Sequence, residues 1–340
     1  MTVTAICSLS HRSSPITIIE MLAVETFDLT KDYKTGFWRK RPRRALSGLN
    51  LKVELGETFG LLGPNGAGKS TTLKILFKLI FPTVGSARIL GRDLSDLSVH
   101  ARVGYLPENP NFYDHLSAQE FLEFAGQLFG LDGNSVRGRA HQLLERVGLT
   151  ECKDLAIRKF SKGMVQRLGI AQALINAPEV IFLDEPMSGL DPIGRREVRN
   201  LILDLRREGK TIFFSTHILA DAETLCDRVA ILNHGCLLGC GELQEILRMD
   251  VSATEMVLES PTARALEELQ PYVRAMVRTG DRVRVEVADV NEALSVALAA
   301  GARVASLNPV KSSLEDYFMA QVGGTDIGAS ADGEAASDDD

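Results

Sequence analysis

One short stretch, residues 63–71, constrains the fold more than any other part of the chain. It reads Gly-Pro-Asn-Gly-Ala-Gly-Lys-Ser-Thr and fits the pattern G-x-x-x-x-G-K-[ST], which is typical of a loop that binds phosphate groups. The apolar run 58–62 before it predicts a buried strand, and the spacing of apolar residues in 72–81 predicts a helix. Strand, glycine-rich turn and helix are the context that this pattern requires.

The residue types of this loop fit a nucleotide and its metal ion. Glycines at three of the positions let the backbone turn tightly and point N–H groups at phosphates. Lys69 is expected to reach the β- and γ-phosphates, and Ser70 to place its hydroxyl on Mg²⁺. We therefore predict nucleotide contacts along the whole loop: Gly63, Pro64, Asn65, Gly66, Ala67, Gly68, Lys69, Ser70 and Thr71.

The composition is that of a soluble globular protein, with 45% hydrophobic and 24% charged residues. A net charge of -7 argues against wholesale nucleic-acid binding, and five scattered cysteines fit a reducing compartment. The sequence has no run of about 18 apolar residues that would span a membrane. We expect Met21 to be the natural start, with residues 1–20 and the acidic tail 323–340 disordered.

Strands and helices alternate after the loop, and this order predicts a mostly parallel sheet with helices on its faces. Residues 180–184 are four apolar residues and an acid, typical of a buried parallel strand, and 211–215 predicts the next strand. Ligands bind at the carboxyl ends of such strands. Gly63, Asp184 and His217 each follow a strand end, so we expect them to converge.

The segments around this α/β core carry weaker signals. Residues 24–29 predict an edge strand, and the basic run 38–44 predicts a solvated loop rather than a membrane or partner contact. Between about 110 and 165 we expect an inserted helical subdomain whose first helix opens at a capping box, Ser117-x-x-Glu120. Further helices are predicted over 135–147, 165–176 and, after the Asp191-Pro192 pair, up to Gly209.

The character of the chain changes beyond about residue 250. The patterns predict strand, helix, strand, strand, helix and strand between residues 253 and 307, with a hairpin turn at Thr279-Gly280. That order is typical of a ferredoxin-like α+β domain. We expect this accessory domain to cover 250–322 and to end in a short helix over 312–322.

Two adjacent carboxylates follow the strand 180–184. Asp184 is placed to hold Mg²⁺ beside the phosphate-binding loop, as a strand-end aspartate does in such folds. Glu185 is placed to orient or deprotonate an attacking water. The pair therefore predicts metal-assisted hydrolysis of the nucleotide.

A further segment, Phe160-Ser161-Lys162-Gly163-Met164, precedes that strand, and Ser188-Gly189-Leu190-Asp191 and His217 follow it. In this order the motifs resemble the ATP-binding cassette of ABC transporters, over roughly residues 22–245. The resemblance implies a P-loop NTPase cassette at 21–245 that binds ATP and Mg²⁺.

The same resemblance assigns further site residues. Ser161 and Gly163 match the signature residues that reach the ATP of a second cassette, so it implies that two cassettes, identical or paralogous, pair head to tail. His217 matches a histidine that touches the γ-phosphate, and Asp191 belongs to the matched loop and is counted with the ATP contacts. Tyr33 stands where the family stacks an aromatic ring on adenine, with Phe37 and Trp38 as nearby alternatives.

Several positions depart from the family pattern. Glu108 stands where the family usually has glutamine; we count it as a catalytic and Mg²⁺-binding candidate, although glutamate cannot donate a hydrogen bond. Met164 lacks the amide usual in the signature, and Lys162 either adds a cation near phosphate or faces solvent. These departures and the segment 313–318 resemble the export branch, whose cassettes serve separate permeases; the alternative for 313–318 is a helix that caps the small domain.

The resemblance implies a cytoplasmic ATPase subunit at the inner face of the cell membrane, which powers an exporter through ATP-driven cassette dimerisation. It also implies that the permease docks in a groove between the Glu108 loop and the helices of residues 117–147, and no nucleic-acid partner is expected. The alternatives are a soluble ABC ATPase that acts on ribosomes or nucleic acid, and a regulatory module without turnover. A single phosphate-binding loop and only short helices between residues 69 and 161 argue against the first, and Glu185 and His217 against the second.

Overall fold

The computed structural model describes residues 22–35, 41–248, 253–310 and 314–315. The expectations for the segments 1–20 and 323–340, for Phe37 and Trp38, and for most of the helix 312–322 lie outside these residues. In the described ranges, no helix combines the length and the apolar character needed to cross a bilayer.

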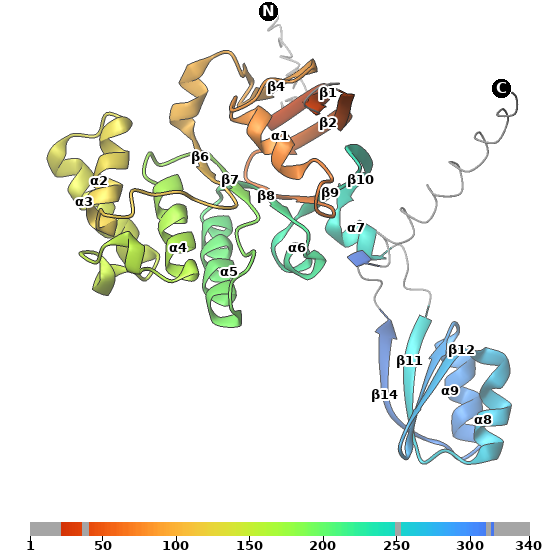
Figure 1. The fold of residues 1–340 in the computed structure, drawn as a ribbon. Coiled ribbons are helices and arrows are strands. Elements are labelled where there is room, and N and C mark those ends of the chain that lie inside the picture. The colour runs from red at the N-terminus through yellow and green to blue at the C-terminus, as the bar shows by residue number, and fades with distance from the viewer. Residues whose placement is uncertain (1–21, 36–40, 249–252, 311–313, 316–340) are drawn as a thin grey trace, which may run out of the picture.

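A six-stranded sheet lies at the centre of the larger part of the molecule (Figure 1). Its strand order is β10-β9-β3-β8-β7-β6, and every neighbouring pair is parallel except β10 with β9. The prediction of a mostly parallel sheet is therefore confirmed. The strands are β3 (Thr58–Leu62), β6 (Val103–Leu106), β7 (Val180–Asp184), β8 (Thr211–Thr216), β9 (Arg228–Asn233) and β10 (Cys236–Glu242).

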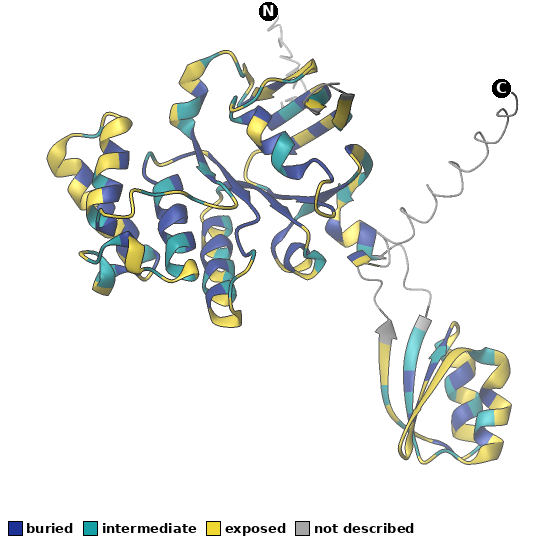
Figure 2. Cartoon of the chain, viewed as in Figure 1, coloured by how far each residue is buried: buried dark blue, intermediate teal, exposed yellow. Residues whose placement is uncertain are grey.

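Both faces of this sheet are buried, which explains why its central strands are apolar at successive positions. On one face Phe59, Phe182 and Phe213 pack with ring centroids 5.4 and 5.5 Å apart, beneath helix α1 (Lys69–Leu76). The opposite face packs against further helices, and Figure 2 shows the sheet dark blue between partly exposed helices. Those helices are α4 (Lys162–Ala173), α5 (Pro192–Arg207), α6 (Leu219–Leu225) and α7 (Leu243–Arg248). Helices α2 (Ala118–Leu128) and α3 (Gly133–Arg146) pack against each other and against α4.

A second, antiparallel sheet has the order β2-β1-β4-β5 and covers the α1 side. The prediction of an edge strand over residues 24–29 is wrong, because β1 (Leu22–Thr35) pairs with β2 (Arg41–Glu54) on one side and with β4 (Val84–Ile89) on the other. The prediction of a loop over residues 38–44 is wrong from Arg41 onward, because edge strand β2 begins there. The last strand, β5 (Arg92–Asp93), is two residues long.

Helix boundaries follow the capping groups more closely than the apolar pattern. The capping box at Ser117 is confirmed: its side chain accepts from Glu120 N, and the Glu120 carboxylate accepts from Ser117 N. The helix predicted over 165–176 begins at Lys162, because Ser161 caps it by accepting from Met164 N. Helix α1 ends at Leu76, and Lys78 already has a φ of 55°.

The C-terminal part is a four-stranded antiparallel sheet in the order β12-β13-β11-β14, drawn apart from the rest in Figure 1. Its apolar residues pack with those of α8 and α9 in a core of their own. The elements are β11 (Ala253–Glu259), α8 (Ala263–Leu269), β12 (Val273–Thr279), β13 (Arg282–Val287), α9 (Val290–Ala299) and β14 (Arg303–Val310).

Leu314 follows this sheet but does not belong to its core. It is fully buried within the apolar cluster of the larger part, which also contains Leu243 and Ile246 of α7. Its N–H donates to Glu223 Oε1 on α6 at 2.8 Å. The idea that this segment caps the small domain is therefore wrong at Leu314, the position where the structure tests it.

Candidate active site

The phosphate-binding loop lies between β3 and α1, at the carboxyl end of the central sheet (Figure 1). Two of its glycines are required by close backbone contacts. A Cβ atom on Gly63 would stand 2.2 Å from the Leu232 carbonyl oxygen, and one on Gly68 would stand 2.6 Å from that of Ala45. Gly68 also has a φ of 111°, which side chains other than hydrogen strongly disfavour.

A pocket of about 300 Å³ opens beside this loop. The predicted residues Lys69, Glu108, Glu185 and His217 all contribute to its wall, although they come from three different strand ends and from α1. Gly63 and Asp184 do not line the pocket, but each binds a residue that does: Lys69 Nζ donates to Gly63 O and Ser70 Oγ donates to Asp184 Oδ1. The expected convergence of Gly63, Asp184 and His217 at the carboxyl ends of the strands is therefore confirmed. The full lining is Ala45, Asn65, Gly66, Gly68, Lys69, Ser70, Thr71, Glu108, Glu185, Ser188 and His217.

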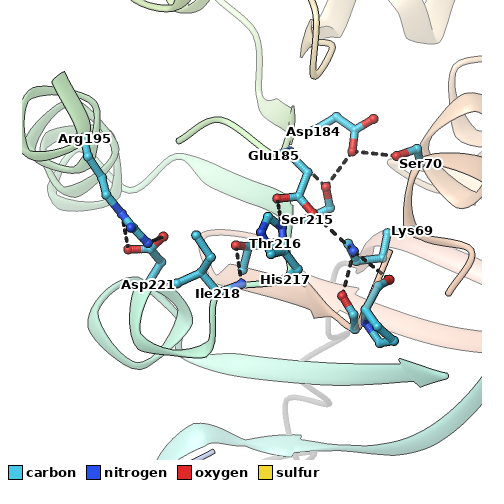
Figure 3. Close-up of polar contacts among 12 residues, drawn as sticks. Lys69, Ser70, Asp184, Glu185, Arg195, Ser215, Thr216, His217, Ile218 and Asp221 are labelled. Carbon is cyan, nitrogen blue, oxygen red and sulfur yellow. Dashed lines mark hydrogen bonds and ion pairs between the residues drawn. The ribbon is translucent and has the colours of Figure 1, made fainter. Parts of the chain in front are cut away.

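Lys69 is almost fully buried and is held by its own loop. Its Nζ donates to the carbonyl oxygens of Gly63 at 2.7 Å and Pro64 at 3.2 Å. The same ammonium forms an ion pair with Glu185, 3.2 Å from Oε1 (Figure 3). The buried positive charge is thus neutralised by a carboxylate, and a bound polyphosphate would compete for it.

Glu185 occupies a strained backbone position, with a φ of 48°, immediately after β7. Its N–H donates to Ser215 Oγ at 3.0 Å, and its Oε2 lies 2.8 Å from His217 Nδ1. The other oxygen, Oε1, is buried and receives no hydrogen bond, since its contact with Lys69 has the distance of an ion pair without hydrogen-bond geometry. Glu185 therefore has, at the pocket wall, a carboxylate oxygen that can still accept a hydrogen bond.

Asp184 lies beside the first helical turn of α1. Its Oδ1 accepts from Ser215 Oγ at 2.6 Å and from Ser70 Oγ at 3.1 Å (Figure 3). Burial raises the pKa of Asp184, the two serine hydroxyls lower it, and the nearby charges of Glu108 and Glu185 raise it further. This site carries several acids in a small volume and is suited to a cation.

Seven of the predicted ATP contacts do not line this pocket. Three of them, Gly63, Pro64 and Ala67, belong to the phosphate-binding loop itself, and the other four lie on other elements. Ser161 and Gly163 are at the N-terminus of α4, and Asp191 caps α5 by accepting from Gly194 N at 3.0 Å. Tyr33 lies on β1, where Lys31 Nζ is 5.2 Å from the centroid of its ring.

Sequence reasoning missed three residues of this site. Ser188 lines the pocket, but only Asp191 of the same loop was predicted as a contact. Ala45 lines the pocket, but nothing in its residue type indicates a role. Ser215 bridges Asp184 and the Glu185 backbone, and it pairs directly with Asp184 in the β7–β8 register. Its place two residues before His217, at the end of a predicted strand, was the available signal.

The geometry can be compared with known proteins. Residues 46–188 match the family model described as ABC transporter. An ABC transporter ATP-binding protein of Synechocystis sp. is 47% identical over 307 residues, which cover 89% of this chain and 86% of the relative. A fluoroquinolones export ATP-binding protein of Mycobacterium tuberculosis is 34% identical, with 84% of this chain and 89% of the relative covered.

Among solved structures, the ATP-binding cassette MJ0796 in a dimeric post-hydrolysis state bound to ADP and Pi has a TM-score of 0.59 and 29% identity. The match covers 65% of this chain and 98% of that cassette.

Proposed function

Since the chain belongs to the ABC transporter family of ATP-binding proteins and is an ATPase of that family, we propose that it powers export through a separate membrane permease. The observation that carries the catalytic part is the arrangement around Glu185. Its buried Oε1 has no hydrogen-bond donor, while Oε2 is held by His217. This is the environment expected of a general base that orients a water.

The residues beside the loop fit Mg²⁺. The serine hydroxyl and the aspartate carboxylate are hard oxygen ligands, and Ser70 Oγ and Asp184 Oδ1 already lie 3.1 Å apart. Within the described ranges no group of three or more His, Cys, Asp or Glu side chains forms a metal site of its own, as expected for an ion that also needs phosphate oxygens. Glu108 would join through a bound water. The bound ion would neutralise charge on the β- and γ-phosphates.

The residues of the chain then carry the remaining steps. Lys69 exchanges Glu185 for the phosphates, which leaves the glutamate free to take a proton from water through Oε1. The water oxygen bonds to the γ-phosphorus. The bond between that phosphorus and the oxygen bridging the β- and γ-phosphates breaks, and ADP leaves with its electron pair. His217 keeps the carboxylate oriented and contacts the γ-phosphate.

Three of the thirteen predicted ATP contacts are supplied in trans in this proposal. Ser161, Gly163 and Asp191 lie outside the pocket of their own chain, which supports a head-to-tail pair of cassettes, identical or paralogous. The dimeric form of the cassette MJ0796 supports the same arrangement. Tyr33 remains our candidate for stacking on adenine.

The permease contact is placed on α2 and the loop before it. Tyr113, Phe124, Leu128 and Phe129 are exposed aromatic or aliphatic side chains, and the rings of Tyr113 and Phe124 pack edge-on with centroids 5.6 Å apart. An exposed apolar group of this kind suits a protein contact. It borders the groove predicted between the Glu108 loop and residues 117–147, which supports our proposal that the permease docks there and that the subunit works at the cytoplasmic face of the membrane.

We divide the chain into the cassette, 21–245, with its helical subdomain at about 110–165, and an accessory domain. The sequence predicts 250–322 for this accessory domain, and we end it before Leu314, because Leu314 packs in the core of the cassette. The order β14-β11-β13-β12, all antiparallel, together with one helix after β11 and one after β13, supports a ferredoxin-like accessory domain.

Substitution of Glu185 by glutamine tests the proposed function. Glu185→Gln keeps the shape of the side chain but cannot accept the proton, so steady-state phosphate release should fall by about 1,000-fold. ATP should still bind, and the variant should accumulate as an ATP-bound dimer in size-exclusion chromatography with light scattering. Glu197→Gln, a substitution of a half-exposed glutamate on α5, is the matched control. Normal phosphate release by Glu185→Gln would remove Glu185 from this role.

A further inference from the structure

The segment that carries His217 has little local support on its C-terminal side. His217 lies between β8, which is fixed by pairing with β3 and β7, and α6, a helix of only seven residues. The N-cap residue of α6, Ile218, makes no side-chain capping bond, although its N–H donates to Thr216 Oγ1 at 3.0 Å. Because so short a helix is marginal by itself, contacts with other elements must hold it in place.

The strongest of these contacts is a buried ionic cluster. Asp221 of α6 is fully buried, and Arg195 Nη2 donates to its Oδ2 at 2.5 Å while Arg195 Nε lies 3.3 Å from Oδ1. Arg199 Nη2 donates to Oδ1 at 3.1 Å. Figure 3 shows the two-pronged contact of Arg195 with Asp221 beside the His217 segment. Three charge-assisted bonds fix the orientation of the carboxylate as well as its position.

The two arginines lie on α5, the helix that follows the pocket-lining loop of Ser188. They are four residues apart on α5, so they present the same face of that helix. Helix α5 starts directly after the loop 188–191, and Ser188 of that loop lines the nucleotide pocket. Arg195 is in the first turn, where its N–H donates to the Asp191 carbonyl at 2.9 Å. Asp221 thus links the His217 segment to a second segment of the same pocket.

Resting on the proposed roles of Glu185 and His217, we propose that Asp221, held by Arg195 and Arg199, is a positioning residue that keeps His217 against Glu185 during hydrolysis. The cluster does not touch the pocket, since none of its three residues lines it. Its loss therefore affects turnover and leaves ATP affinity in place. Removing the Asp221 charge leaves Arg195 and Arg199 without their ion-pair partner and removes the ionic contact between α6 and α5.

The test is a kinetic comparison of Asp221→Asn with the parent protein. A misplaced catalytic group costs between about 10- and 100-fold in rate, so kcat should fall within that range while the dissociation constant for ATP changes by less than about twofold. Asp204→Asn, which removes an exposed aspartate paired with Arg207 on α5, is the matched control and should leave both values unchanged. Unchanged kcat in Asp221→Asn, or an equal loss of binding and turnover, overturns the proposal.

A double-mutant cycle separates positioning from general destabilisation. In a His217→Ala background, Asp221→Asn should cause no further loss of turnover, because the side chain that it positions is absent. Additive losses would assign Asp221 a merely structural role and overturn the proposal. If His217→Ala itself turns over normally, the proposed role of His217 fails, which is a separate result from additivity in the cycle.

A milder variant keeps the proposal testable if Asp221→Asn does not fold. Arg199→Lys retains the positive charge and leaves Arg195 in place, while the planar fork is lost. It should lower kcat by about threefold, less than a full misplacement, with ATP affinity unchanged. Parental turnover in folded Arg199→Lys, where Asp221→Asn cannot be purified, overturns the proposal.

Discussion

Two regions of the molecule carry ATP contacts predicted from the sequence. One is the rim formed by the carboxyl ends of β3, β7 and β8, and the other is the N-terminus of α4. They differ in how many of their site residues contact other elements of the same chain. At the rim, Lys69, Glu185 and His217 lie within 3.2 Å of a partner from another element. At α4, Ser161 is exposed and its hydroxyl serves its own helix by accepting from Met164 N. The rim is assembled from several elements of a single chain, while the Ser161 hydroxyl contacts only the helix that it caps.

This difference indicates which of the two regions should supply most of the free energy of ATP binding. The rim holds a preorganised cation and buried acceptors, so it should bind ATP in the monomer. The α4 terminus should matter only when a second copy supplies the phosphates. Substitutions at the two regions should therefore separate binding from turnover.

Lys69→Ala should give the largest effect at the rim. It removes the buried ammonium and leaves the Glu185 carboxylate without its ion pair, and charge-assisted bonds of this kind are worth up to about 3 kcal/mol, or roughly 100-fold in affinity. Isothermal titration with ATP measures the change. Lys74→Ala, an exposed lysine of the same helix, is the control. An ATP affinity equal to that of the parent would erase the distinction between the regions.

Ser161→Ala should have an intermediate effect, confined to turnover. The lost hydroxyl contact in trans corresponds to about tenfold in phosphate release, while ATP binding by the monomer stays unchanged. The substitution also removes a helix cap, which costs about 1 kcal/mol of stability. Asp132→Ala removes the equivalent cap of α3 and serves as the control for that cost. If both variants lose turnover equally, α4 contributes only stability.

Asp184→Asn should give the smallest effect, measured as stability without nucleotide. Because burial raises the pKa of Asp184, its contribution to stability is present below the ordinary value of 3.8 and is lost as the pH rises through the raised value. The uncharged variant should thus be more stable than the parent near pH 8, on the order of 1 kcal/mol, and this gain should shrink toward pH 4. Urea unfolding at both values measures it.

The control for that experiment comes from the other region. Asp191→Asn changes an exposed N-cap for one of equal quality and should leave stability nearly unchanged at either pH. A gain for Asp184→Asn that is the same at both pH values would mean that the buried charge is not its source.

The sequence sufficed for features whose cause is local. The loop 63–71, the capping box at Ser117 and the strand end at Asp184 each have a pattern dictated by backbone geometry. What it did not reveal depends on contacts between distant segments: β1 reads as an edge strand because its pairing with β4 leaves no local mark. Ser215 is an ordinary strand residue until the β7–β8 register places it against Asp184. The resemblance to a known family, rather than periodicity, supplied Ser161, Gly163 and Tyr33.

The return of Leu314 to the cassette has a practical meaning for anyone who wishes to remove the accessory domain. The chain leaves the cassette after α7 and re-enters its apolar core at Leu314, so the small sheet is built like an insertion rather than an appendage. A stop codon after α7 would delete Leu314 from the cassette core to which Leu243 and Ile246 also belong. An excision that splices a short flexible linker from the end of α7 to Leu314 would keep that core complete.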